Sequence, residues 1–221
     1  NKEIEKALTG NFNLFIQALA NCRAGAALFP ETAVFWNNPT AVQHACLILQ
    51  NIPDAPARVK WGVFCTRLAQ TTGMATETFI SCINRRLRMT KKRRLFTELC
   101  LSAALKIDAA NALPTEDLIR LIDRIDGKTD EHRLDDIIAV RRALRFTEKS
   151  VTNETLFEKS ATLCLQAAKF LKTLHPRHMP SFKTLPRDGR LKTAFMTWRI
   201  ACLKQFLSQE NTFKDKRGPL A

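Results

Sequence analysis

Apolar residues recur every three and four positions along most of the chain, the spacing that places side chains on one face of an α-helix. Leu14, Ala18 and Cys22 form one such stripe. No stretch combines alternating apolar and polar residues with the β-branched enrichment of a strand. Expected helices cover 14–26, 42–49, 57–71, 75–89, 92–108, 115–126, 130–147, 153–174 and 190–208. The pattern predicts an all-α fold, an irregular array or bundle of about eight to ten helices.

Proline and glycine mark the breaks between these helices. One helix start carries Thr40 and Gln43 at the spacing of a capping box, in which each side chain satisfies a free amide of the first turn. The predicted organisation is a helical array over 1–174, a Pro-rich connector over 175–189, a C-terminal helix over 190–208 and a basic tail over 209–221. The tail has few apolar residues, so we expect it to be extended or disordered unless a partner holds it.

Two segments share the pattern Leu-Cys-Leu-x-Ala-Ala, at 99–104 and 163–168, and a Leu-Phe pair precedes each. Small residues at such positions let neighbouring helices approach closely. With these residues the chain resembles α-helical repeat families such as pentatricopeptide and HEAT-like arrays over roughly 11–208, which implies stacked helical hairpins. An irregular bundle with coincidental cysteine spacing accounts for the same pattern, and the choice between the two stays open.

Seven cysteines, an odd number, are spread along the chain without a Cys-x-x-Cys pair. Each lies in an apolar helical stretch. We therefore expect reduced, buried thiols and a reducing compartment such as the cytosol or an organelle matrix. No run approaches the roughly 18 consecutive apolar residues of a transmembrane helix, so none is expected.

The net charge of +14 is concentrated in two blocks. Residues 58–94 carry ten Lys and Arg against one acidic residue, and residues 169–221 carry twelve against three. The densest segment, 85–94, has seven cations in ten positions. Such charge repels itself unless an anion lies against it, and a polyphosphate chain is the commonest anionic partner.

Motifs for catalysis and cofactors are missing from the sequence. It contains no Gly-x-Gly loop, His-Glu-x-x-His or Gly-x-Ser-x-Gly. Residues 132–136 are similar to part of a kinase catalytic loop, but its companion motifs are absent, and a solvated helix start is favoured. Cys164, His175 and His178 offer only one thiol to a zinc ion. We therefore predict no catalytic residue, no metal and no cofactor.

The basic blocks are the candidate site. Lys and Arg in such runs bind phosphate oxygens and fix orientation without reading sequence. The predicted RNA- or phosphate-contacting residues are Arg85, Arg86, Arg88, Lys91, Lys92, Arg93 and Arg94 in the first block, and Lys183, Arg187, Arg190, Lys192, Lys214, Lys216 and Arg217 in the second.

In general character the chain resembles lineage-specific mitochondrial ribosomal proteins, with basic helices, a basic tail, cysteines expected to be reduced and Asn1 in place of a start Met. A removed targeting presequence would leave such a start, and so would an arbitrary boundary. The resemblance implies a non-catalytic structural component of a large ribonucleoprotein, an organellar ribosome or its assembly machinery, that contacts ribosomal RNA and neighbouring proteins in the mitochondrial matrix. The alternative is a helical scaffold, adaptor or secreted effector, in the cytoplasm, that binds an acidic protein or an anionic membrane surface. An enzyme ranks third.

Overall fold

The computed structural model describes residues 2–126, 132–146, 151–184 and 187–216, with side chains throughout except at 151–153 and 210–216. These residues form thirteen α-helices and three short 3-10 helices and contain no strand, which confirms the all-α prediction. The α-helices are α1 Lys2–Thr9, α2 Phe12–Asn21, α3 Ala24–Leu28, α4 Ala33–Trp36, α5 Pro39–Gln50, α6 Ala57–Thr72, α7 Thr76–Leu87, α8 Lys91–Ser102, α9 Ala104–Asp108, α10 Thr115–Asp126, α11 Arg133–Arg145, α12 Val151–Thr173 and α13 Gly189–Lys216, and the 3-10 helices are η1 Pro30–Thr32, η2 Ala110–Ala112 and η3 Pro176–His178.

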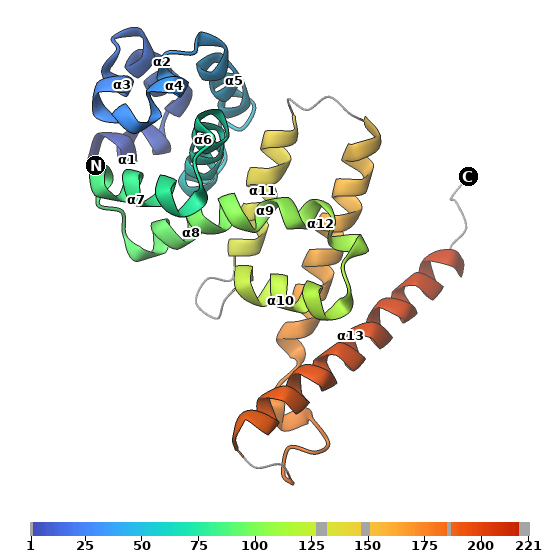
Figure 1. Ribbon diagram of the computed structural model, residues 1–221. Helices are drawn as coiled ribbons and strands as arrows, with labels where there is room; N and C mark the ends of the chain where they lie inside the picture. Colours follow the sequence, from blue (N-terminus) through green and yellow to red (C-terminus); the bar gives the residue numbers. More distant parts are fainter. Residues whose placement is uncertain (1, 127–131, 147–150, 185–186, 217–221) are drawn as a thin grey trace.

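Helix α6 lies at the centre of the N-terminal half, between α1–α5 and the later helices α8 and α11 (Figure 1). Its apolar residues occur on all sides, and ten of its sixteen residues are buried. Gly62 lets α11 approach closely, because a Cβ there would lie 2.7 Å from Cγ2 of Val140. Next to it, the indole N–H of Trp61 donates to Oγ1 of Thr97 in α8 at 2.9 Å. The centre of the fold therefore combines close helix packing with a satisfied buried polar pair.

The C-terminal half packs α9, α10 and α11 against the long helix α12, and α13 crosses α10 and α12 (Figure 1). An ion-pair cluster joins these helices. Arg141 of α11 donates to both carboxylate oxygens of Asp108 in α9, at 2.6–3.1 Å, and Arg145 donates to the same carboxylate at 2.9 Å. Arg145 also lies over the ring of Phe157 in α12, 5.2 Å from its centroid.

Four local expectations differ from the structure. The N-cap of α5 is Asn38, whose Oδ1 accepts from the Ala41 amide at 3.1 Å, so the predicted Thr40–Gln43 capping box is wrong. Pro39 occupies the first helical position, which suits a residue without an N–H. The helix expected over 92–108 breaks at the buried Ala103 into α8 and α9. Helix α13 continues to Lys216, so the beginning of the expected extended tail is helical. Helix α11 begins at Arg133; its expected start at 130 lies outside the described residues, as does 217–221.

The two Leu-Cys-Leu-x-Ala-Ala segments both contribute small buried side chains, but their backbones differ. The first spans the break between α8 and α9, whereas the second lies within the continuous helix α12. Cys100 and Cys164 are buried at the centre of these segments, and Cys46 and Cys65 are also buried. The prediction of burial is wrong for Cys22, which is exposed after the end of α2. All seven thiols are free.

Candidate nucleic-acid interface

The first basic block lies where α7 ends and α8 begins. Phe79, Ile80 and Ile83 anchor α7 in the core, so its last turn projects toward solvent. Arg88 ends that helix in the left-handed conformation, with φ 47°, and its amide donates to the Asn84 carbonyl at 2.8 Å. The Thr90 hydroxyl then caps α8 by accepting from the Arg93 amide at 3.3 Å. Two helix ends therefore present their charged side chains close together.

Three of the seven cations in this block are tied to acidic residues that are distant in sequence. Arg85 and Arg86 share the carboxylate of Glu31, at 2.6 and 3.1 Å. A hydrogen bond from its own backbone amide, together with the Arg86 guanidinium, holds the pKa of Glu31 below its usual range. Arg93 donates to both oxygens of Glu5 in α1, and this guanidinium lowers the pKa of Glu5. Sequence reasoning missed both acids, because no local spacing links them to the block.

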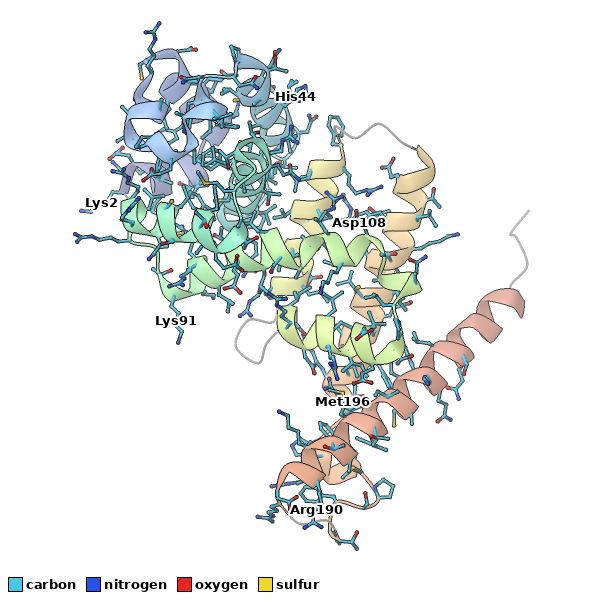
Figure 2. The ribbon with its side chains drawn as sticks, in the orientation of Figure 1. Lys2, His44, Lys91, Asp108, Arg190 and Met196 are labelled. Carbon is cyan, nitrogen blue, oxygen red and sulfur yellow. The ribbon has the colours of Figure 1, made fainter. Side chains whose placement is uncertain are left out.

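Four cations of the block remain directed to solvent: Arg88, Lys91, Lys92 and Arg94, which we call the junction cluster. Figure 2 shows Lys91 extending away from the body of the protein. Arg88, Lys91 and Arg94 have no acidic partner among the described residues. The first turn of α8 also contains no acidic residue, and a helix N-terminus itself carries partial positive charge. The positive potential at this junction is therefore only partly compensated within the protein.

Aromatic rings do not contribute to this surface. The two aromatic residues in α7 and α8, Phe79 and Phe96, are buried, and Trp61 beneath Arg93 is 1 % exposed. A surface of guanidinium and ammonium groups without exposed rings can bind phosphate oxygens but offers no ring for base stacking.

The second block lies elsewhere in the fold. Lys183, Arg187, Arg190 and Lys192 are exposed on the connector and the first turns of α13. In Figure 1 this segment lies at the lower end of the fold, whereas the α7–α8 junction lies beside α1. The fold therefore does not join the two blocks into one surface. The side chains of Lys214 and Lys216, and the whole of Arg217, lie outside the described residues.

The residues that the sequence suggested for chemistry have structural contacts. Asp136 is buried in an ion pair with Arg58, and Arg133 donates to the Ile125 carbonyl at 3.2 Å. Burial raises the pKa of the Cys46 thiol to about 11 and that of Cys164 to about 12, which keeps both protonated at neutral pH. No group of three His, Cys, Asp or Glu within the described residues is placed to hold a metal ion. None of the helices described there is both long and apolar enough to span a bilayer.

No protein-family model, curated protein or solved structure matches this chain. The argument about function therefore starts from the surface itself.

Proposed function

We propose that this protein is a non-catalytic structural component of a ribonucleoprotein and that it contacts RNA phosphates through the junction cluster. The observation that carries the proposal is the charge imbalance at the α7–α8 junction. Seven cations gather there, and the carboxylates that contact them are those of Glu5 and Glu31. An RNA backbone supplies regularly spaced negative charge, and its binding releases counterions.

The backbone at Arg88 supports the same proposal. The position after a helix end that takes the left-handed conformation is usually occupied by glycine, because a Cβ there costs about 1 kcal/mol. Here an arginine occupies it and extends from the centre of the junction. A cationic side chain at a position that suits glycine is consistent with a role for its charge.

The kind of contact follows from the groups available. Cations without exposed rings favour the phosphate backbone of folded RNA over splayed bases, so binding should depend little on sequence. We place the protein in an organellar ribosome or its assembly machinery, in the mitochondrial matrix, because its basic helices and its mostly buried free thiols match the general character of such components.

The test is binding of a folded RNA hairpin at several salt concentrations, measured with the full chain and with the variant R88Q/K91Q/K92Q/R94Q. The control variant removes four cations from exposed positions outside the junction: R23Q/K106Q/K159Q/K169Q. For a duplex each phosphate contact adds about 0.9 to the slope of log affinity against log salt, so the junction variant should lose roughly two to three units and the control less than about one. Equal losses in both variants, or no loss in the junction variant, would overturn the proposal.

A further inference from the structure

Helix α13 has two apolar faces, and the inner face attaches it to the protein. Phe206 stacks on Phe170 of α12 with ring centroids 4.4 Å apart, and Arg199 donates to both oxygens of Asp123 in α10 at 2.6 and 2.7 Å. Leu203 between them is fully buried. The inner face consists of Met196, Ile200, Leu203, Phe206 and Leu207.

The outer face of α13 consists of Leu191, Ala194, Phe195, Trp198, Ala201 and Cys202. These residues follow one another at three and four positions, so they share one side of the helix, away from the inner face. They lie outside the hydrophobic core that the described residues form, and each remains partly or fully exposed. A helix that is apolar on two sides normally packs against a neighbour on both.

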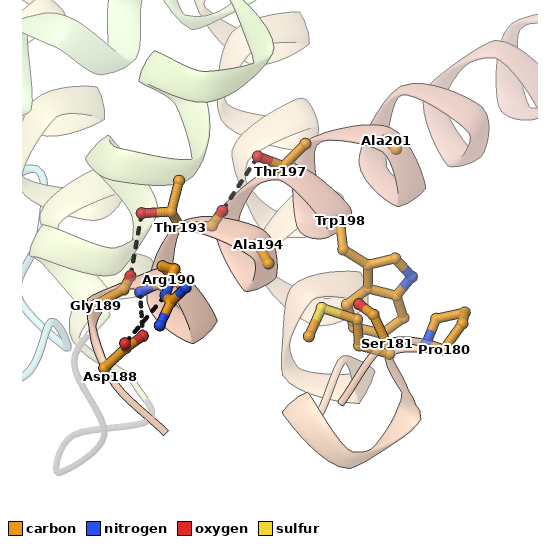
Figure 3. A pocket seen from close by; sticks show the side chains of 11 residues that line it. Pro180, Ser181, Asp188, Gly189, Arg190, Thr193, Ala194, Thr197, Trp198 and Ala201 are labelled. Atoms are coloured by element: carbon orange, nitrogen blue, oxygen red, sulfur yellow. Dashed lines mark hydrogen bonds and ion pairs between the residues drawn. The ribbon is translucent and has the colours of Figure 1, made fainter. Parts of the chain in front are cut away.

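An open hollow lies against this outer face. The connector residues Met179, Pro180 and Ser181 form one wall, the first turns of α13 form the other, and the space is about 930 Å³ (Figure 3). Trp198 closes one end beside Pro180 and Ser181. Ala194 and Ala201, one heptad apart, line α13 where a second helix would approach. The hollow therefore has the length, the small residues and the aromatic end of a helix-binding groove.

The charges around this hollow identify the occupant. Between 189 and 209, α13 carries four cationic residues and no acidic one. The connector adds exposed cations at Arg177, Lys183 and Arg187, while its one acid, Asp188, pairs with Arg190 at 3.1 Å. A second copy of the chain would bring like charges together, which disfavours self-association. RNA would satisfy the cations but leave the apolar side chains uncovered.

We infer that the outer face of α13 and the connector form a docking groove for an amphipathic helix of a partner protein, with an apolar face and acidic flanks. The partner's apolar residues cover Phe195, Trp198 and the alanines, and its carboxylates face Lys192 and Lys204. This inference concerns a surface separate from the junction cluster and does not depend on RNA binding.

The probe is a designed helical peptide with Ala and Leu on one face and Glu on both flanks, compared with a peptide in which Lys replaces every Glu. Anisotropy measurements use the full chain, the variant A201R, and A27R as the matched control, since Ala27 is an exposed alanine on a helix outside the groove. The acidic peptide should bind saturably and the basic one should not. A201R should weaken the acidic peptide by roughly tenfold or more, because it fills the hollow, while A27R leaves binding unchanged.

Three results would overturn the inference. One is no saturable binding of the acidic peptide, or equal binding by A201R and the parent chain. Another is displacement of the peptide by an RNA hairpin in the R88Q/K91Q/K92Q/R94Q background, which would assign the groove to RNA. The third is a dimer in sedimentation that A201R dissociates, which would assign the face to a second copy. Loss of hairpin binding in the junction variant alone bears on the proposed function and leaves this inference standing.

Discussion

The guanidinium of Arg93 lies over the indole ring of Trp61, 5.4 Å from its centroid. The same indole donates to the Thr97 hydroxyl, which in turn donates to the Arg93 carbonyl at 2.9 Å. Arg93 is therefore held by the centre of the fold at its backbone and at its side chain. The basic block consequently contains one cation with a structural role among several that face solvent.

This division predicts that Arg93→Ala lowers the free energy of unfolding by about 1–2 kcal/mol, because it removes the cation–π contact and the pair with Glu5. Arg94→Ala, at the neighbouring exposed position, should change it by less than about 0.5 kcal/mol. Urea unfolding followed by circular dichroism measures both. For RNA affinity the order should reverse, with Arg94→Ala the weaker binder; the opposite order in both measurements contradicts the division.

Arg88 and Arg23 provide a matched pair, because both are exposed arginines with positive φ, at 47° and 58°. Glycine adopts this conformation without strain, so Arg88→Gly and Arg23→Gly should each leave stability unchanged or raise it by up to about 1 kcal/mol. Only Arg88→Gly should weaken RNA binding. A variant that folds at least as well yet binds less would separate charge from structure, and parallel effects of the two variants on binding would argue against the junction.

Glu31 limits the charge available at the junction, since its carboxylate contacts two arginines. Glu31→Gln should therefore free Arg85 and Arg86, raise RNA affinity and steepen the salt slope by up to roughly two units. Glu158→Gln is the control, because it makes the same change in net charge by freeing Arg142 on α11. If Glu158→Gln raises affinity as much, the gain reflects overall charge alone.

The lowered pKa values of Glu5, Glu31 and Glu158 also predict how stability depends on pH. A carboxyl whose pKa is lower in the folded state stabilises that state above the unfolded value of 4.5, and the contribution is lost as pH falls through the folded value. Unfolding measured from pH 6 down to pH 3, flagged as a range of about three units, should show falling stability below roughly 4.5. The variant E5Q/E31Q/E158Q should show a shallower fall; an identical curve would contradict the pairing.

Gly62 tests the packing of α6 against α11. Gly62→Ala should destabilise the protein by about 1–3 kcal/mol, because the new methyl group would overlap Val140 Cγ2 and contact Cys100 Sγ. Gly189→Ala is the control, since a Cβ there meets nothing within 4 Å. It should be neutral or slightly stabilising in thermal unfolding, whereas equal effects at the two glycines would mean that the helices can separate without cost.

The sequence predicted those features of the fold that depend on local periodicity. The helix expected over 57–71 corresponds to α6, and the helix expected over 115–126 matches α10. The end of α13 was placed too early because the tail lacks apolar residues, yet a helix already nucleated can extend through residues of good helix propensity without burying them.

The candidate site was predicted only in outline. The charge run located the α7–α8 junction, but Arg93 and Glu5 are 88 positions apart and Arg85 and Glu31 are 54 apart. Such pairs depend on how α1 and η1 pack beside α7 and α8, which no local pattern in the sequence specifies. The groove on α13 was missed for the same reason, since its second wall comes from the connector.

The position of Trp198 also gives the protein a built-in optical reporter. The other two tryptophans, Trp36 and Trp61, are 6 % and 1 % exposed, so water and small quenchers hardly reach their rings. Trp198 is partly exposed at the end of the hollow. Red-shifted emission that acrylamide quenches first therefore comes mainly from this one indole, and its blue shift would record a ligand covering α13 while the emission of the core stays constant.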